Sequence, residues 1–493
     1  MIVDLKKREN KPIYECLYEF IKAEIISGRL KKGEKLPSRR QMALDNGIAE
    51  ITVANAYAQL VTEGYIESRE KSGYYVLALS EQESEQRDES VVLATIGQKY
   101  QGFSNVHADL PSTGANEKQH IQKIIANFSD SSLPENTFPF DTWSKLTRRI
   151  LSMERSECIK SPSAQGIPEL RRAIADYLER SRGFSCDPSR IVIAPGTEYL
   201  NEMLLKLIGG VSFVAMEDPG YPAISRLYEN SANKCIHIPV DESGLITDEL
   251  KDKNIKMVHV SPSHHFPLGV VMSASRRAAL AGWASENDAW IVEDDYDSEF
   301  RFEGRPVPPL ASSYPDRVVY MNTFSRTLSP SIRVAFMVLP KGLYDIYNDK
   351  MTYRSGGVST LNQLTLRSFI SEGYYERHIN RMKNFYRKRK NAIREIAENG
   401  CFSEFFECEG DGSGMMFLLK PLPGNDILKN GETIIKKLEN QGIILNSVND
   451  YCYNKLVMTN NRYIVNFGHV TEENFERASQ IICDVLRKNK CRN

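Results

Sequence analysis

The sequence lacks the features that mark several classes of protein. Its nine cysteines are scattered and form no C-x-x-C pair, so we expect a reducing compartment and no zinc or other metal site. It has no long uncharged apolar run and no apolar stretch near its start, so neither a membrane span nor a secretory signal is expected. The formal net charge of −1 gives no global attraction to nucleic acid, so any DNA-binding surface must be local. These absences predict a cytoplasmic protein without a membrane partner.

The sequence is long enough to form more than one hydrophobic core. A chain of 493 residues is expected to form two or three domains. Residues 80–90, SEQESEQRDES, are polar and acidic, as is typical of a solvated linker. We therefore predict an N-terminal module at 1–79, a linker at 80–126, a large domain at 127–350 and a small C-terminal domain at 351–493.

The N-terminal module reads as three helices and a hairpin. Pro12 suits a first helical turn, and the apolar residues that follow it recur at helical spacing (Ile13, Leu17, Ile21 and Ile25). A second helix is expected after the N-cap Ser38, and a third at about 50–63 with apolar positions at Ile51, Val53, Ala54, Tyr57 and Leu60. Two β-like segments, 64–68 and 74–77, complete the pattern of a winged helix-turn-helix.

From about residue 127 apolar strands alternate with amphipathic helices, which predicts an α/β fold with a largely parallel sheet. Strands are expected at 190–193, 212–216, 256–260, 289–292 and 317–321, and helices at 169–182 and 276–286. A polar motif follows each strand, and ligands of such sheets bind beyond the carboxyl ends of strands. Alone, D-P-G-Y is typical of a turn, and D-D-Y-D of a solvated loop or a metal candidate. Five motifs at five strand ends instead favour one shared ligand site.

The N-terminal motifs resemble the GntR-type DNA-binding domain. They are Leu36-Pro37-Ser38-Arg39-Arg40, Thr52-Val53, Glu63-Gly64-Tyr65-Ile66 and Ser72-Gly73-x-Tyr75-Val76. The resemblance implies a double-stranded DNA operator, with the third helix in the major groove, a DNA contact from Arg40 and a phosphate contact from Arg39. It also implies DNA-binding roles for Thr52 and Gly73. Arginine suits these tasks because it pairs with phosphates and can read guanine edges.

Glu50 departs from this pattern, because the family usually has arginine just before the Thr-Val pair. A carboxylate repels phosphate but can accept a hydrogen bond from cytosine. Glu50 therefore either shifts base preference or faces away as an N-terminal acid favoured by the helix dipole.

The five strand-end motifs resemble fold-type I aminotransferases, and specifically the MocR branch of GntR regulators, in which such a domain follows the winged helix. The resemblance implies a pyridoxal 5'-phosphate (PLP) site. Asp294 would pair with the pyridine nitrogen, Tyr296 with the 3-hydroxyl, and Tyr221 would stack on the ring. The phosphate would be held by Gly196, Thr197, Ser325 and Arg333 with Thr323 as a further contact, and His264 or His265 would line the ring edge.

Arg326 stands where that family has the lysine that forms an imine with PLP. An imine needs a neutral amine, and a guanidinium stays protonated. We therefore expect no catalytic residue, and PLP held without a covalent bond if it binds at all. The competing outcome is that Arg326 fills the cavity and leaves an anion site. A regulator sensing a PLP-like or amino-acid-like ligand is the main interpretation. The alternatives are an active aminotransferase with a DNA-binding appendage and a purely structural dimerisation domain.

A second departure concerns the arginine that grips a substrate carboxylate in that family. Its position is held by Ile464, and Arg462, two residues earlier on the same strand face, is the candidate substitute. The resemblance also implies a homodimer, which would suit paired DNA half-sites.

Overall fold

The computed structural model describes residues 13–76 and 124–490, apart from gaps at 32, 63–64, 70–72, 131–132, 135–136, 210–212, 232–233, 303–306, 411–413, 424–430 and 455–461. The chain divides into two compact units on either side of residue 106. The linker predicted at 80–126 lies outside the described residues except for its last three. None of the described helices is long and apolar enough to cross a bilayer.

The N-terminal unit is a winged helix. Helices α1 (Ile13–Ile26), α2 (Arg39–Asn46) and α3 (Glu50–Thr62) precede a hairpin of β1 (Ile66–Arg69) and β2 (Gly73–Val76). The hydroxyl of Ser38 accepts a hydrogen bond from the Gln41 backbone N–H at 3.2 Å, which caps the start of α2. Gly47 ends that helix in the left-handed region, at φ 62°. The predicted order of helices and hairpin is therefore confirmed.

One predicted core position of this unit is wrong. Helix α3 buries Val53, Ala56, Tyr57 and Leu60 at the i, i+3, i+4 and i+7 positions, which form one face of a helix. Ile51 lies off that face and is 68% exposed. An isolated apolar residue near the start of a helix satisfies the periodicity only loosely, and packing decides where it points.

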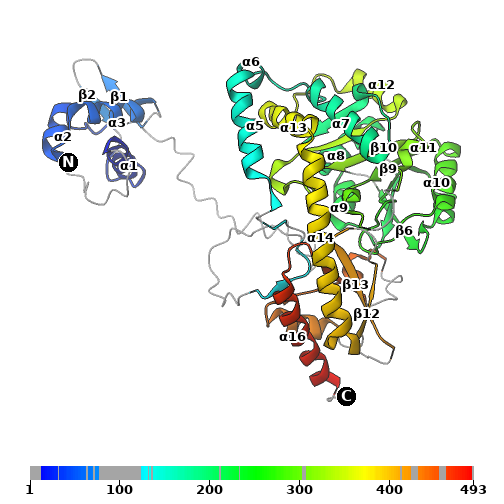
Figure 1. Ribbon diagram of the computed structural model, residues 1–493. Coiled ribbons are helices and arrows are strands. Elements are labelled where there is room, and N and C mark those ends of the chain that lie inside the picture. Colours follow the sequence, from blue (N-terminus) through cyan, green and yellow to red (C-terminus); the bar gives the residue numbers. More distant parts are fainter. Residues whose placement is uncertain are drawn as a thin grey trace. The chain divides into compact units, whose positions relative to one another are not determined.

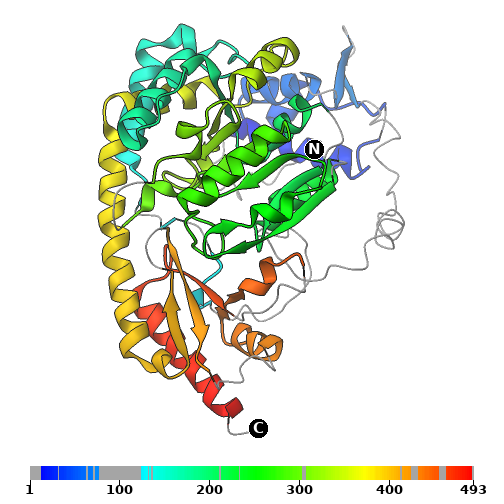
Figure 2. The same cartoon turned by 90° about the vertical axis from the view of Figure 1, so that its right-hand side faces the viewer.

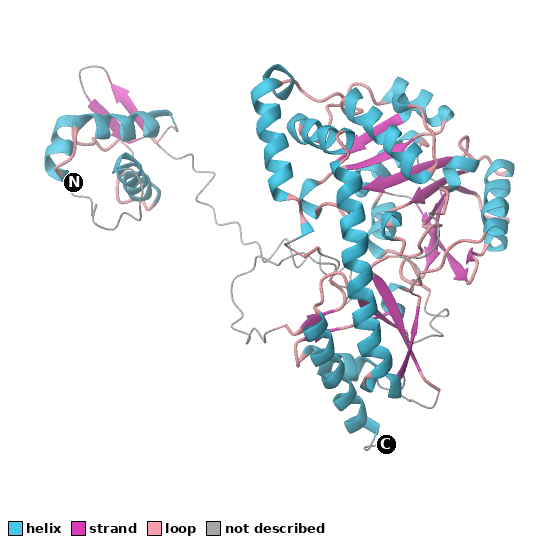
Figure 3. Cartoon of the chain, in the orientation of Figure 1, coloured by secondary structure: helices cyan, strands magenta, loops and turns pink. Residues whose placement is uncertain are grey.

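The second unit is built on an eight-stranded sheet (Figure 3). Its order is β4 (Ile191–Ala194), β11 (Ala335–Val338), β10 (Val318–Thr323), β9 (Trp290–Asp294), β8 (Ile255–Val260), β5 (Phe213–Asp218), β6 (Lys234–Asp241) and β7 (Gly244–Leu245). Strands β10, β9, β8, β5 and β6 pair in parallel, whereas β11 runs antiparallel to both β10 and β4. All five predicted strands are present; β6, β7 and β11 were not anticipated.

Alternate residues of the central strands enter two separate cores. Val258 and Ile291 face one core, while Met257 and Val292 face the other. Burial on both faces explains why these strands read as unbroken apolar runs in the sequence. The covering helices are α5 (Phe140–Met153), α6 (Arg155–Cys158), α7 (Pro168–Arg182), α8 (Thr197–Leu207), α9 (Pro222–Asn230), α10 (Ala274–Glu286), α11 (Leu310–Ser313), α12 (Lys341–Lys350) and α13 (Thr360–Ser371).

A small domain completes the second unit. The long helix α14 (Tyr374–Asn399) runs from beside the large sheet into this domain, as the two views agree (Figures 1 and 2). The domain has an antiparallel sheet of β12 (Phe406–Glu409), β13 (Met416–Pro421), β16 (Tyr463–Asn466) and β15 (Asn446–Ser447), with helices α15 (Gly431–Glu439) and α16 (Glu472–Lys490). Strand β3 (Ala126–Asn127) pairs with β14 (Ile443–Ile444), so the chain first enters this unit through the small domain's core.

Candidate functional site

The carboxyl ends of the parallel strands bring the predicted motifs to one edge of the large sheet. Met321 of β10 is in register with Asp294 of β9, and Val260 of β8 is in register with Glu293. The segments that follow these strands therefore leave the sheet side by side. This is the edge at which α/β sheets bind ligands.

Gly196 and Arg333 form the phosphate side of the predicted site. A Cβ added to Gly196 would lie 2.5 Å from Nη2 of Arg333, so a side chain at this position would displace that guanidinium. Gly196 also precedes α8, whose first backbone N–H groups lack helical partners and favour an anion. However, Nη2 of Arg333 also lies 3.5 Å from Oε2 of Glu198. Glu198 therefore competes with any phosphate for this guanidinium.

Asp294 carries the clearest sign of a missing partner. Its Oδ1 is buried and accepts no hydrogen bond from any described residue. Its Oδ2 lies 3.5 Å from Nε2 of His259 on β8. Behind His259, the hydroxyl of Tyr228 lies 2.8 Å from Nδ1 and donates to Oδ1 of Asn201 at 2.6 Å. This buried chain of side chains holds the Asp294 carboxylate in place and leaves one oxygen available.

Tyr296 lies close to both a histidine and the unusual arginine. Its hydroxyl is 3.2 Å from Nδ1 of His264, and that nitrogen is 2.9 Å from Oδ2 of Asp297. Burial raises the pKa of Tyr296 well above its usual value, the neighbouring Asp297 raises it further, and the charge of Arg326 opposes both. Arg326 therefore acts electrostatically on the residue expected to meet the 3-hydroxyl of PLP. Of the two candidate histidines, it is His264 that contacts Tyr296.

His265 faces a different partner. Its Nε2 lies 3.8 Å from Oε2 of Glu217, which accepts the Ser261 backbone N–H at 2.9 Å. Burial lowers the pKa of His265 to about 3 and raises that of Glu217 to about 8. Although the two lie within ion-pair distance, both shifts favour the neutral forms near pH 7, so we read them as a neutral pair.

Tyr221 leaves much of its ring open. Its side chain is 45% exposed, and the ring meets Phe266 edge-on at 6.0 Å between centroids. The neighbouring Gly220 backbone N–H donates to the Tyr451 carbonyl of the small domain at 3.0 Å. An exposed ring of this kind offers a face for stacking.

Thr323 and Ser325 shape the turn that follows β10. The Ser325 backbone N–H donates to the Thr323 hydroxyl at 3.1 Å, and Thr323 is 8% exposed. Thr323 therefore supports the turn directly. The predicted phosphate contacts of Thr197, Thr323 and Ser325 remain predictions.

The position of the usual carboxylate-binding arginine is apolar. Ile464 is 4% exposed and packs in a cluster with Met416, Leu418, Val448, Phe266, Leu268 and Tyr451. The candidate substitute Arg462 pairs instead with Glu409, at 2.9 Å from Nε to Oε2. The guanidinium of Arg462 is thus engaged within the small domain's sheet.

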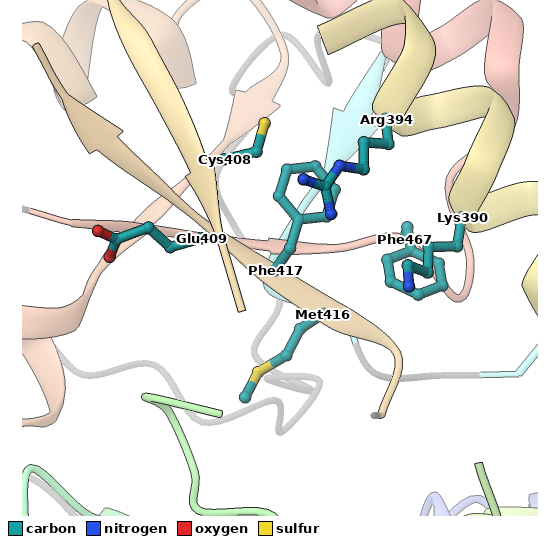
Figure 4. A pocket seen from close by; sticks show the side chains of 7 residues that line it. All are labelled: Lys390, Arg394, Cys408, Glu409, Met416, Phe417 and Phe467. Carbon is teal, nitrogen blue, oxygen red and sulfur yellow. The ribbon is translucent and has the colours of Figure 1, made fainter. Parts of the chain in front are cut away.

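The residues fit a phosphorylated pyridine on two grounds. The unpartnered Oδ1 of Asp294 could accept a pyridinium N–H, and the Arg333 guanidinium beside the start of α8 offers a cation for an anion. The described residues hold no cluster of histidine, cysteine or acidic side chains suited to a metal ion. A separate cavity in the small domain, between α14 and the sheet, has a volume of only about 10 Å³ and can hold about one water molecule (Figure 4).

The winged helix presents its predicted DNA-binding residues to solvent. Arg39 and Arg40 occupy the first turn of α2, and both are exposed and form no ion pair with another described residue. Glu50 is the first residue of α3 and is exposed, while Thr52 is half-buried. A Cβ on Gly73 would lie 3.2 Å from Cε of Lys35. The sequence had not singled out Lys35, which adds a cation beside the hairpin.

Sequence reasoning also missed parts of the ligand site. His259 is the second-last residue of β8 and stands between the buried Val258 and Val260, and a histidine in this apolar context was the available signal. Gly414 of the small domain, at φ 73°, approaches the ring of His264 so closely that a Cβ would collide with it. No local sequence pattern around Gly414 predicts this contact with His264.

Comparison with known proteins identifies both units. Residues 13–76 match the model of the gntR family of bacterial regulatory proteins, and residues 125–482 match aminotransferase class I and II. The chain is 34% identical over 410 residues to the HTH-type transcriptional regulator YdeL of Bacillus subtilis, covering 83% of this chain and 84% of that protein. It is 33% identical over 402 residues to the probable rhizopine catabolism regulatory protein MocR of Rhizobium meliloti, covering 79% and 78%.

A solved structure shares the fold of the second unit. The multiple substrate aminotransferase of Thermococcus profundus superposes with a TM-score of 0.64 at 22% identity, covering 76% of this chain and 94% of that one. This likeness shows the fold alone. The chain combines a winged helix with an aminotransferase-type second unit, and it shares most of its length with two regulators. It therefore belongs to the MocR subfamily of GntR-type regulators.

Proposed function

We propose that this protein is a DNA-binding transcriptional regulator whose aminotransferase-like unit senses a small ligand without catalysing its conversion. The observation that carries the proposal is that Asp294 offers a free acceptor for a pyridine ring while arginine replaces the imine-forming lysine at position 326. Asp294 keeps an oxygen free for a pyridine nitrogen, whereas the cation that acts on Tyr296 is Arg326 and not lysine.

The ligand we propose is PLP or a related pyridine phosphate, held by non-covalent contacts. PLP supplies an electron-withdrawing ring when bound. The chain's own residues would bind and orient it: Asp294 at the pyridine nitrogen, Tyr296 at the 3-hydroxyl, Tyr221 over the ring and Arg333 at the phosphate. The guanidinium of Arg326 cannot act as a neutral nucleophile. Turnover as an aminotransferase is further disfavoured because Ile464 and its apolar neighbours provide no cation for a substrate carboxylate.

DNA recognition is assigned to α2, α3 and the hairpin. The exposed Arg39 and Arg40 are free of ion pairs with described residues, so they can neutralise phosphates or read bases without first breaking an internal contact. Thr52, Gly73 and Glu50 are the further candidates at this surface.

A homodimer is the proposed working form. Several large apolar side chains near the junction of α5 and α6 are exposed, including Met153 (78%), Ile159 (87%) and Tyr353 (84%). The Gly356 backbone N–H donates to the Pro162 carbonyl, so the loop that follows Tyr353 lies against the segment after Ile159. Exposed apolar side chains gathered in this way mark a protein–protein contact.

Selection from a random DNA pool tests the regulatory function directly. The full chain should enrich a specific sequence with two related half-sites, and the Arg39→Ala/Arg40→Ala double variant should enrich none. Failure of the wild-type protein to enrich any sequence, with and without PLP, would rule out the proposal.

A further inference from the structure

A second pocket lies outside the predicted PLP site. It has a volume of about 290 Å³ and is formed by α7, α14 and the short turn of helix at Ser298–Phe300. Its charged lining comprises Arg180, Arg182, Glu299, Glu376 and Lys383. This volume is large enough for a metabolite of a few heavy atoms, unlike the cavity of the small domain.

Most of these charges are already paired. Arg182 lies 2.9 Å from Oδ2 of Asp295, with both side chains buried, and Arg180 lies 3.1 Å from Oε1 of Glu376. Within each pair the two charges cancel. The acid and base of the pocket that remain are Glu299 and Lys383.

Glu299 and Lys383 both lack a full set of partners, and Nε and Nη2 of Arg182 also form no hydrogen bond with a described residue. Glu299 is 5% exposed, and its buried Oε2 accepts no hydrogen bond from a described residue, while Oε1 is 3.3 Å from the Asn322 amide. Lys383 is half-buried and forms no hydrogen bond or ion pair within the described part of the chain. A buried polar group left without a partner is costly, and in a native protein it calls for a missing ligand or water.

We propose that this pocket binds a small zwitterion, such as a free amino acid, whose ammonium group contacts Glu299 and whose carboxylate contacts Lys383. A simple cation would leave Lys383 without a partner, and a simple anion would leave Glu299 without one. A molecule that carries both charges satisfies both. The site is distinct from the PLP site and goes beyond the function proposed above.

The protonation behaviour of the two groups agrees with this assignment. Burial raises the pKa of Glu299 to about 7 and lowers that of Lys383, so each is poorly stabilised in its charged form by the protein alone. A bound ligand of opposite charge would favour the ionised form of each. Both shifts follow mainly from burial, although the charge of Arg182 opposes the shift of Glu299 and the charge of Glu299 opposes that of Lys383.

The pocket is also tied to the loop that carries the PLP-site residues. Ser298, in its wall, donates to Oδ2 of Asp295 at 2.8 Å, and Asp295 directly follows Asp294. Occupancy of the pocket therefore acts on the same loop as the residues expected to bind the pyridine ring. This connection gives an amino acid a physical route to alter ligand binding at the first site.

Calorimetric titration of the full chain with glycine, L-alanine, L-glutamine and L-leucine tests the proposal. At least one should bind, and Glu299→Gln and Lys383→Met should each weaken binding by about tenfold or more, because each removes a charge-assisted hydrogen bond. Lys388→Met, an exposed lysine of the same helix, should leave binding unchanged. Isoamylamine and 4-methylpentanoate, which carry one charge each, should bind more weakly than L-leucine.

Several results would overturn the assignment. These are no binding by any of the four amino acids, equal weakening in Lys388→Met, or binding of 4-methylpentanoate as tight as that of L-leucine. Loss of binding in Asp294→Asn would place the amino acid in the PLP site instead. Should the pocket variants fail to fold, acetylation of Lys383 in the wild-type chain by limiting acetic anhydride, followed by mass spectrometry, decides the matter. A bound amino acid should slow that reaction, and no protection would refute the proposal.

Discussion

Nε2 of His259 lies 3.5 Å from one carboxylate oxygen of Asp294, while the other oxygen is buried without a hydrogen-bond partner among the described residues. One side of the carboxylate is thus held by a chain of buried polar groups that runs through Tyr228 to Asn201. Asp294 is the last residue of β9, at the carboxyl edge of the sheet. A pre-positioned acceptor of this kind is suited to a pyridinium N–H.

Asp294→Asn should weaken PLP binding by about tenfold or more, because an amide replaces the charged acceptor for the pyridinium. Equilibrium dialysis or fluorescence titration of the purified chain measures the change. Asp288→Asn is the matched control, since Asp288 is 82% exposed and pairs with Arg317 away from the strand ends. Equal affinities for wild type and Asp294→Asn would remove Asp294 from the site.

Arg326→Lys should allow an imine to form with PLP. Lysine can lose its proton and attack the aldehyde, whereas the guanidinium cannot. The expected result is a new imine absorption band and, after borohydride reduction, a PLP adduct on Lys at position 326 by mass spectrometry.

Arg333→Lys is the control for that experiment and should give no band, because its side chain is expected at the phosphate. A reduced adduct on any lysine of the wild-type site would show that the imine survives and that the sensor-only interpretation is wrong. If neither the wild type nor Arg326→Lys binds PLP, the pocket has diverged beyond this one residue.

Glu198→Gln should strengthen the binding of PLP. The Glu198 carboxylate lies 3.5 Å from the Arg333 guanidinium, and its removal leaves that cation free for the phosphate and takes away a like charge. Because both side chains are about half exposed, solvent screens the pair and the gain should be only severalfold. Glu202→Gln, one turn further along α8 and also exposed, is the control and should have no effect. Weaker PLP binding in Glu198→Gln would place the phosphate elsewhere.

Arg40→Ala should reduce operator affinity by roughly 1–3 kcal/mol if its side chain makes a bidentate base contact. A gel-shift titration on the selected DNA sequence measures this loss. Arg29→Ala is a suitable comparison, because Arg29 is engaged with Glu24 at 2.7 Å and is not among the predicted DNA contacts. A titration curve for Arg40→Ala that coincides with wild type would contradict the assignment.

Ile159→Asp should convert a dimer into a monomer and lower DNA affinity, since a charge at a buried apolar contact cannot be satisfied there. Light scattering at working concentrations reports the mass. Ile124, also exposed at 58% but outside this cluster, offers a control in Ile124→Asp. A wild-type monomer with full DNA affinity would refute the dimer.

The sequence by itself determined the main elements of this protein. The order of three helices and a hairpin, the N-cap at Ser38 and the five apolar strands all follow from local signals: capping chemistry, helical periodicity and continuous burial on both sheet faces. The strand-end motifs could be located in the same way, because each directly follows its strand. The two departures, Arg326 and Ile464, were likewise visible as residue types at motif positions.

Only the tertiary structure decided which side chains meet. Ile51 points to solvent because four other apolar residues of α3 fill the core. Arg462 forms an ion pair with Glu409, and His264 rather than His265 contacts Tyr296. Strand register and domain packing fix those distances. The chain from Asn201 to Asp294 joins residues 93 positions apart, and the pocket of Glu299 and Lys383 joins two segments 84 apart. Contacts between such distant segments depend on packing, which local sequence patterns do not encode.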